Sequence, residues 1–142
     1  MSNAYYQIRI EPKDEEKNAI TAGQYGAWQI KVMLQGDCNA PATMMRIMHT
    51  ILSPYLGKFV WVYLDDILIF SNTKDEHIDH LRKVFAKLAE YSFHLRMDKC
   101  ELMIDKIEVL GHTIEGRMIM PSMEKITHIT DFPIPANKKQ LQ

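Results

Sequence analysis

The sequence lacks a strong net charge, a set of closely spaced cysteines and a long apolar run. Its 17 Lys and Arg residues nearly balance 18 Asp and Glu residues, so composition gives no direct support for nucleic-acid binding. The two cysteines, Cys38 and Cys100, show no CxxC spacing, which argues against a disulfide framework and a zinc site. No apolar run reaches the roughly 20 residues of a membrane span, so we expect neither a membrane segment nor a signal peptide.

A hydrophobic content of 46% over 142 residues is enough for one domain with a core. The stretch 59–70, FVWVYLDDILIF, is apolar or aromatic except for the adjacent Asp65 and Asp66. This composition predicts two buried strands with the acidic pair at the bend between them. One interpretation of the pair is a polar hairpin turn, since Asp is a common turn residue. The alternative is a cleft that binds a hard divalent cation such as Mg²⁺.

Apolar periodicity predicts two helices, at about 40–52 and 75–91. Thr73 and Glu76 fit the capping box that begins the second helix, whose predicted buried face is Ile78, Leu81, Phe85 and Leu88. On the same helix His77 and His80 are three residues apart, and we interpret this spacing as coincidence on a charged outer face. Strands or extended segments are predicted at 5–10, 19–21, 28–33, 93–97, 107–110, 112–114 and 118–120, with hairpin connections through the glycines of 23–26 and around Gly116. A short helical turn after Pro12, a helix over 121–130 and a rigid link over 132–135 complete the prediction.

Tyr63-Leu64-Asp65-Asp66 resembles the YxDD box of reverse transcriptases, and its surroundings are similar to those of gypsy-like long-terminal-repeat retrotransposons. Other matching stretches follow in the family's order, namely 39–43, 75–84, 99–101, 110–112 and 132–135. The resemblance covers residues 5–142. It implies an α/β (α+β) polymerase palm in which an antiparallel sheet is backed by two helices, followed by the start of the thumb.

The implied domain organisation has three parts. Residues 1–4 look like the remnant of an expression tag, because Ser-Asn-Ala is a familiar cleavage scar. Residues 5–120 are the reverse transcriptase palm, with a partial fingers insertion at about 12–34. Residues 121–142 are the start of the thumb or connection.

The resemblance implies an RNA-directed DNA polymerase that uses Mg²⁺, with Mn²⁺ as an alternative, and that binds an RNA or DNA template-primer and deoxynucleoside triphosphates. Asp65 and Asp66 would be catalytic metal ligands, Asp65 the more direct one. The implied nucleotide-binding residues are Tyr5, Gln35, Gly36 and Lys99, and the implied primer grip is Leu110, Gly111 and His112.

Some of these roles have plain structural alternatives. Tyr5 would lie beneath the incoming sugar and reject a 2′-hydroxyl, or it is a strand aromatic. Lys99 would donate a proton to pyrophosphate, or it is an ordinary surface lysine. Gly111 needs only turn geometry.

The sequence departs from the family pattern in several places, one of which is a hairpin at Glu115-Gly116 that is shorter than is common in the family. The family's first catalytic aspartate lies five positions before the aromatic that matches Tyr5, which falls before Met1. We therefore expect this chain by itself to be inactive. In addition, Leu34 replaces a proline, and Asp37-Cys38 replace an apolar and a small polar residue. An extra carboxylate there would oppose triphosphate binding.

Two further expectations concern assembly and location. A degenerate or domesticated palm that acts as a protein-interaction module is the alternative function. A truncated sheet would expose an edge, so we expect some self-association through that edge. The expected location is intracellular, in the cytoplasm or a virus-like particle, with the nucleus as an alternative.

Overall fold

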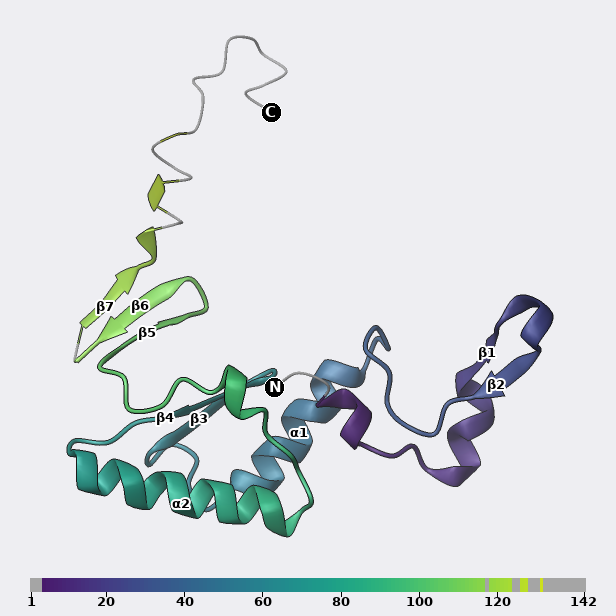
Figure 1. Cartoon of the computed structure of the whole chain (residues 1–142), viewed down its shortest axis with the longest axis horizontal. Coiled ribbons are helices and arrows are strands. Elements are labelled where there is room, and N and C mark those ends of the chain that lie inside the picture. The colour runs from purple at the N-terminus through teal and green to yellow at the C-terminus, as the bar shows by residue number, and fades with distance from the viewer. Residues whose placement is uncertain (1–3, 117, 124–125, 128–130, 132–142) are drawn as a thin grey trace. The chain divides into compact units, whose positions relative to one another are not determined.

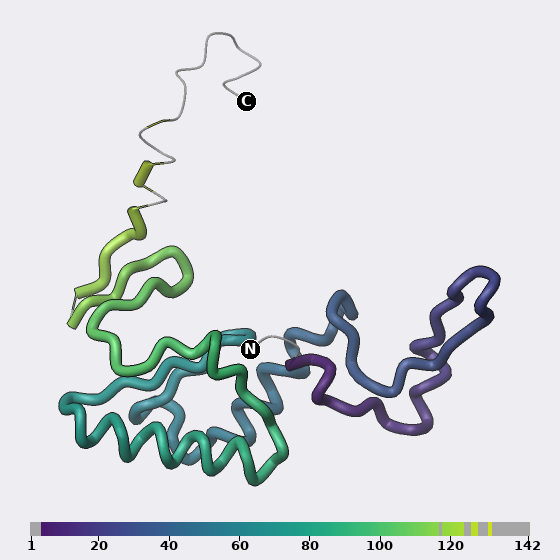
Figure 2. Tube along the Cα trace, in the orientation of Figure 1, coloured from purple at the N-terminus to yellow at the C-terminus, as the bar shows by residue number. Residues whose placement is uncertain are grey.

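Two α-helices and a β-hairpin form the centre of Met1–Cys100, the first of two units in the chain (Figure 1). The second unit is Glu101–Gln142. The computed structural model describes residues 4–116, 118–123, 126–127 and 131. Figure 2 follows the same chain as a trace coloured by residue number.

The core of the first unit lies between helix α1 (Ala40–Leu52), helix α2 (Lys74–Glu90) and the hairpin of β3 (Val60–Tyr63) and β4 (Asp66–Ile69). Helix α1 contacts both β3 and α2, and α2 contacts β4. The buried core residues are Ala4, Met33, Ala40, Met44, Met48, Ile51, Leu52, Val60, Val62, Val84 and Leu88. The predicted α/β class, with antiparallel strands backed by two helices, is confirmed. Within the described residues the strands form three small sheets.

Helix α1 begins and ends at the predicted residues. Asn39 is its N-cap, although its side chain makes no capping hydrogen bond, and Pro41 lies in the first turn. The helix ends at Leu52: Ser53 keeps helical dihedral angles, but Pro54 has no N–H with which to continue the hydrogen-bond ladder. Met44 and Met48, four residues apart on the apolar face of the helix, are fully buried and belong to the core, as helical spacing predicts.

Helix α2 confirms the capping prediction but corrects its buried face. The backbone N–H of Glu76 donates to Thr73 Oγ1 at 3.3 Å. The deeply buried residues are Val84 and Leu88, whereas Ile78 is 39% exposed. The helix has 17 residues, or about 26 Å at 1.5 Å per residue, and the four-residue strands beside it cover only part of that length.

The prediction that His77 and His80 lie on a charged outer face is wrong. Both side chains are half-buried, and their Nδ1 atoms lie 3.0 and 2.8 Å from Ser71 Oγ. The His80 ring also stacks on Phe59 with 3.7 Å between ring centroids. Among the described residues, no group of three or more His, Cys, Asp or Glu side chains could hold a metal. Through their contacts with Ser71, the two histidines thus connect the segment after β4 to the first turns of α2.

The extended segment predicted over 5–10 is confirmed in its second half, whereas the strand predicted over 93–97 is wrong. Tyr5–Gln7 forms a 3₁₀ turn, η1, but residues 8–10 run antiparallel to residues 31–33, with a bridge between Arg9 and Val32 and hydrogen bonds from Ile10 N–H to Lys31 O and from Met33 N–H to Ile8 O. The segment 93–97 contains no strand and leads into another 3₁₀ turn, η4 (Met97–Lys99). The reason is that both backbone hydrogen-bonding groups of His94 pair with the side chain of Gln7 rather than with a strand.

The segment between Pro12 and Gln29 matches its prediction more closely. The helical turn after Pro12 is present as η2 (Pro12–Asn18). Strands β1 (Ala19–Thr21) and β2 (Ala27–Gln29) form the predicted hairpin, joined through η3 (Gly23–Tyr25). The second strand is shorter than predicted.

The second unit contains a three-stranded antiparallel sheet in the order β5-β6-β7. The strands are β5 (Lys106–Val109), β6 (His112–Glu115) and β7 (Met118–Pro121), which confirms the predicted hairpin around Gly116. Residues 123, 126 and 127 are helical, and most of the helix predicted over 121–130, with all of the link over 132–135, lies outside the described residues. The predicted domain boundaries stay predictions.

None of the helices formed by the described residues has the length and apolar character needed to cross a membrane.

The core assignment predicts a large difference between two neighbouring positions of α1. Met48 is fully buried and His49 is exposed. Met48→Ala should lower the free energy of unfolding by about 2–5 kcal/mol, because it leaves a cavity between α1 and the hairpin. The control His49→Ala should change it by less than about 0.5 kcal/mol. Urea unfolding measures both, and equal effects of the two substitutions would contradict the assigned core.

Candidate active site

The acidic pair lies at a two-residue hairpin turn whose backbone is strained. Tyr63 pairs with Asp66 across β3 and β4, so Leu64 and Asp65 form the connection. Leu64 has a φ of 49°, and positive φ at the first central residue is typical of a type II′ turn. Glycine is favoured there, and a leucine costs on the order of 1–3 kcal/mol. The surrounding structure must therefore hold this turn in place.

Met45 of α1 provides part of that support. The backbone N–H of Leu64 donates a hydrogen bond to Met45 Sδ, with 2.9 Å between the two atoms. Met45 is half-buried and packs against the core. Sulfur is a weak acceptor, but the bond positions the N–H of the strained residue. Sequence reasoning missed Met45, because its methionine neighbours in α1 have an adequate explanation as core residues.

Tyr5 lies against Asp65, although the two are sixty positions apart in the chain. Burial, the negative charge of Asp65 and a hydrogen bond to its carboxylate together raise the pKa of the Tyr5 hydroxyl above its ordinary value of 10.0. Asp65 is half-buried, and its Oδ1 oxygen is shielded from solvent. The fully buried Ala4 directly precedes Tyr5 and fixes the start of η1 against the core. Two predicted site residues are thus brought together.

Asp66 is exposed and is the first residue of β4, so the two carboxylates belong to adjacent residues, one in the turn and one in the strand. Adjacent carboxylates are hard oxygen donors of the kind that Mg²⁺ prefers. They fit only part of a metal site, since no cluster of three potential ligands occurs within the described ranges. Asp65 and Asp66 could supply two ligands of a divalent ion, and further oxygens would have to come from elsewhere.

The loop that contains Gln35 and Gly36 is closed by Asp37. The Asp37 carboxylate accepts a hydrogen bond from Leu34 N–H at 3.1 Å, and Asp37 N–H donates to Leu34 O at 3.4 Å. Gly36 has a φ of 112°, which only glycine adopts easily. The two departures from the family pattern in this loop are therefore linked: a proline at position 34 would have no N–H to donate. The carboxylate is used within the loop, which exposes Gln35 and Gly36.

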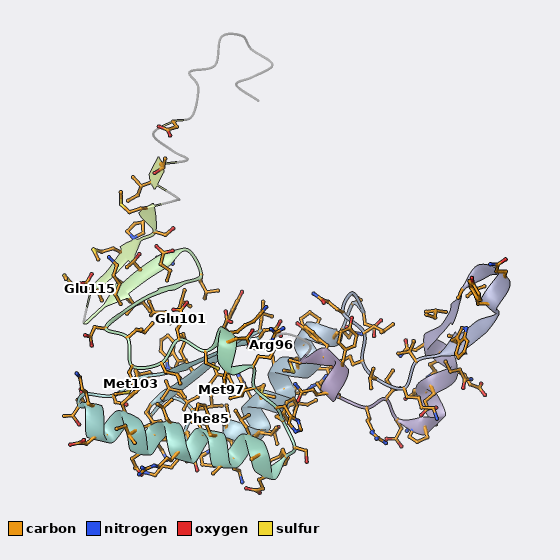
Figure 3. All side chains as sticks on the ribbon, viewed as in Figure 1. Phe85, Arg96, Met97, Glu101, Met103 and Glu115 are labelled. Atoms are coloured by element: carbon orange, nitrogen blue, oxygen red, sulfur yellow. The ribbon has the colours of Figure 1, made fainter. Side chains whose placement is uncertain are left out.

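Lys99 lies at the end of η4 and is exposed. An ion pair between Arg96 and Asp98 flanks it, and Figure 3 labels Arg96 and Met97 in this segment. Lys99 belongs to the same unit as Tyr5 and Asp65. Its predicted role near the nucleotide phosphates stays a prediction.

Leu110, Gly111 and His112 form the turn between β5 and β6 in the second unit. Val109 pairs with His112, and the two intervening residues have φ values of 53° and 69°, the signs of a type I′ turn. The N–H of Ser122 donates to Gly111 O at 3.1 Å. The turn geometry that Gly111 was predicted to provide is present, and its predicted role in gripping a primer stays a prediction.

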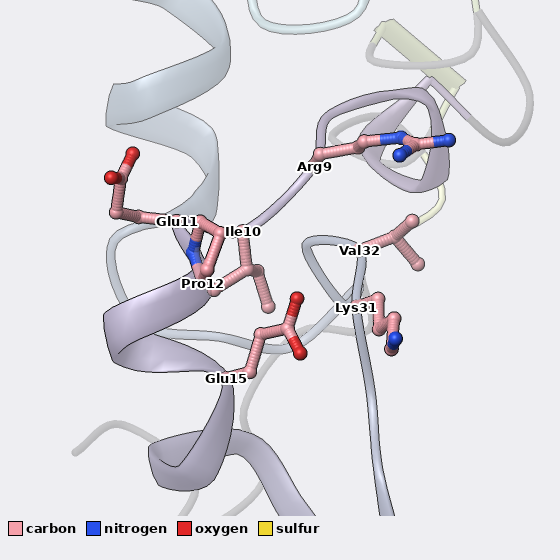
Figure 4. A pocket seen from close by; sticks show the side chains of 7 residues that line it. All are labelled: Arg9, Ile10, Glu11, Pro12, Glu15, Lys31 and Val32. Carbon is pink, nitrogen blue, oxygen red and sulfur yellow. The ribbon is translucent and has the colours of Figure 1, made fainter.

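A pocket of about 470 Å³ lies elsewhere in the first unit (Figure 4). It is lined by Arg9, Ile10, Glu11, Pro12, Glu15, Lys31 and Val32. Its two cationic and two acidic side chains give it no net charge, and it contains none of the predicted site residues. The candidate site is therefore the β3–β4 turn with η1.

Comparison with known proteins gives consistent matches. Residues 1–114 match the family described as "Reverse transcriptase (RNA-dependent DNA polymerase)". The chain is 36% identical over 142 residues to the "Retrovirus-related Pol polyprotein from transposon 297" of Drosophila melanogaster. It is 31% identical to the "Transposon Tf2-3 polyprotein" of Schizosaccharomyces pombe. The whole chain is covered in both cases, but it spans only 13% and 11% of the two polyproteins.

Solved structures of similar fold come from a virus. The foamy viral protease-reverse transcriptase in complex with an RNA/DNA hybrid matches with a TM-score of 0.82 and 26% identity. The match covers all of this chain and 19% of that one. A second structure, described as the "dRH" form in complex with double-stranded DNA, matches with a TM-score of 0.86 over 25% of its chain.

The contact between Tyr5 and Asp65 predicts an abnormal tyrosine titration. The Tyr5 hydroxyl should ionise above pH 10.0, and Asp65→Asn should lower its pKa because the neighbouring negative charge is lost. The folded-state pKa lies above that of the unfolded chain. The contact therefore stabilises the fold fully below about pH 10 and loses this contribution as the pH rises through the folded-state pKa.

The chain has 6 tyrosines. The difference in ultraviolet absorbance between the unaltered chain and Tyr5→Phe, measured against pH, therefore reports the ionisation of Tyr5 alone. The control Glu90→Gln, on the surface of α2, should leave the Tyr5 titration unchanged. A Tyr5 pKa at or below its ordinary value, or one insensitive to Asp65→Asn, would contradict the contact.

The closure of the 34–37 loop predicts that the acceptor matters more than the charge of Asp37. Asp37→Asn keeps an oxygen that can accept from Leu34 N–H, whereas Asp37→Ala removes it. Asp37→Ala should lower the free energy of unfolding by about 1 kcal/mol, and Asp37→Asn should lower it by less. Thermal unfolding compares the two, and equal losses in both variants would show that the hydrogen bond is not what closes the loop.

Proposed function

The chain belongs to the reverse transcriptase family, and from this premise we propose that it forms the centre of the polymerase palm in a longer retrotransposon polyprotein of the gypsy-like class. The proposed activity is RNA- or DNA-templated DNA synthesis from deoxynucleoside triphosphates. The observation that supports it most is the Tyr5–Asp65 contact at the strained hairpin turn. A simple polar turn would need neither the strain nor a shielded carboxylate oxygen.

In the proposed reaction the primer 3′-oxygen attacks the α-phosphorus of the incoming nucleotide, and the bond to the leaving pyrophosphate breaks. Asp65 and Asp66 would hold Mg²⁺, or Mn²⁺ as an alternative. When bound, the ion supplies electrostatic stabilisation of the charge that develops on the phosphoryl oxygens. The hairpin aims the Asp65 carboxylate, and Tyr5 holds it from one side.

The remaining predicted residues would bind the substrates. Tyr5 lies beside a metal ligand, where its ring could also limit the space available to a 2′-hydroxyl. Gln35 and Gly36 are exposed at the apex of a closed loop, where a nucleotide could contact backbone and side chain. Lys99 would protonate the leaving pyrophosphate. Leu110, Gly111 and His112 would grip the primer end.

Other parts of the longer protein would have to complete the site. Two carboxylates are too few for the metal site of a polymerase, and the polyprotein relatives are several times longer than this chain. We propose that the further ligand oxygens come from another part of such a polyprotein. The chain by itself should then be inactive, and the intracellular location stays a prediction.

The proposed partners are a template-primer duplex and a second protein strand. The foamy viral relatives were solved with an RNA/DNA hybrid and with double-stranded DNA, which supports a duplex for this chain as well. Within the described residues β4 pairs only with β3, so its other edge offers backbone groups to a further strand. This open edge supports the proposal that the isolated chain self-associates.

A non-catalytic protein-interaction module is the second candidate function. It is favoured by the exposed aromatic residues on the outer face of the hairpin, where Trp61 is 63% exposed and packs edge-to-face against Phe70. The two candidates differ in whether Asp65 is needed for chemistry.

A primer-extension assay separates them. A protein that extends this chain to the upstream part of its polyprotein should incorporate nucleotides with Mg²⁺, and the chain alone should not. Asp65→Asn in the extended protein should lower kcat/KM on the order of a hundredfold or more, since several kcal/mol of charge stabilisation are lost. The control Asp75→Asn, on the surface of α2, should keep its activity.

Activity that survives Asp65→Asn would refute the catalytic assignment. An extended protein without any incorporation would favour the interaction module.

A further inference from the structure

The side chain of Gln7 pairs with the backbone of a residue far away in the sequence. Gln7 Nε2 donates to His94 O at 3.0 Å, and Gln7 Oε1 accepts from His94 N–H at 2.8 Å. A primary amide carries one donor and one acceptor side by side, so it matches both backbone groups of one residue. Gln7 thus takes the place of the strand that would otherwise pair with this segment.

Gln7 and Tyr5 belong to the same 3₁₀ turn, η1. This turn is closed by hydrogen bonds from Gln7 N–H to Ala4 O and from Ile8 N–H to Tyr5 O, both 3.1 Å long. Ala4 is fully buried, so the turn is fixed to the core at its start. Because the turn is short and closed by these bonds, the backbone positions of Tyr5 and Gln7 are fixed relative to each other. One end of η1 contacts Asp65 through Tyr5, and the other end contacts His94 through Gln7.

The segment that Gln7 binds leads directly to Lys99. Phe93 and Leu95, on either side of His94, are only partly buried against the core. Two residues after Leu95 the chain enters η4, which ends at Lys99. Partial burial of two side chains fixes such a segment weakly, whereas two directional hydrogen bonds at His94 set its position and its orientation.

We propose that Gln7 is a positioning residue of the nucleotide site: its two bonds to His94 fix the segment 94–99, and with it Lys99, relative to Tyr5 and Asp65. This inference deepens the proposed polymerase function and rests on it for the role of Lys99. The clamp itself, meaning the Gln7–His94 pair with η1, is a structural statement that holds independently of catalysis.

The chemistry of the amide makes the clamp testable by single substitutions. Gln7→Leu has a similar size but neither hydrogen-bonding group. Gln7→Glu keeps the acceptor for His94 N–H, but its carboxylate faces His94 O without a proton to donate. A protonated glutamic acid donates again, so lowering the pH toward the ordinary glutamate pKa of about 4.3 should restore the pair. If the side chain at position 7 only filled space, lowering the pH would not restore the position of the segment in Gln7→Glu.

The first experiment measures amide hydrogen exchange of residues 94–99 in this chain. Gln7→Leu should speed exchange of the two hydrogen-bonded amides of this segment, those of His94 and Lys99, on the order of tenfold relative to the unaltered chain at the same pH. At neutral pH, Gln7→Glu should speed exchange of the Lys99 amide as much as Gln7→Leu does. As the pH falls, its exchange rates should approach those of the unaltered chain. The matched control Gln24→Glu, at an exposed position in η3, should change nothing at either pH.

The second experiment measures steady-state kinetics in the upstream-extended protein. Gln7→Leu should raise KM for the nucleotide, lower kcat or do both, with kcat/KM reduced on the order of tenfold. Gln24→Glu should leave both parameters unchanged.

The outcomes separate the clamp from the polymerase function. Unchanged exchange in Gln7→Leu, or no recovery of Gln7→Glu at low pH, would overturn the clamp. Faster exchange with unchanged kcat and KM would overturn the positioning role. If the upstream-extended protein without substitutions were inactive, the polymerase function would be refuted, and hydrogen exchange would then still uphold or refute the clamp.

Discussion

The candidate site of the first unit is organised around one contact, that of the Tyr5 hydroxyl with the Asp65 carboxylate at a strained hairpin turn. A leucine with positive φ and a carboxylate oxygen shielded from water are both unfavourable by themselves. The structure compensates with Met45 below Leu64, Tyr5 beside Asp65 and the buried Ala4 at the start of η1. Strain held by surrounding contacts is typical of functional sites, and here it aims one carboxylate.

Local pattern was enough to predict the elements that carry this turn. The run from Phe59 to Phe70 is apolar except for its acidic pair, so two strands and a bend follow from composition alone. The spacing of Met44, Met48 and Leu52 predicts the buried face of α1. Thr73 and Glu76 predict where α2 begins. In each case the conformation of a residue depends on residues close to it in the sequence, so it can be predicted from the local pattern.

Contacts between a side chain and a distant backbone could not be predicted in this way. Gln7 with His94, and Met45 with Leu64, follow no periodicity, because each depends on how the elements pack. The first pair also explains why the strand predicted over 93–97 is absent. Local context was insufficient for His77 and His80 as well, since Ser71 and Phe59 approach them only in the folded chain. The resemblance assigns Tyr5 to the nucleotide site and Asp65 to the metal site, but neither the resemblance nor any pattern predicts their contact.

The central claim is that the hairpin presents Asp65 as a metal ligand supported by Tyr5. Mn²⁺ titration of the upstream-extended protein, followed by the relaxation of solvent water protons, tests this claim most directly. We expect saturable binding that is lost in Asp65→Asn and retained in Asp75→Asn, because only the first substitution removes a charged oxygen donor from the turn. Binding that is equally strong in Asp65→Asn would contradict the account.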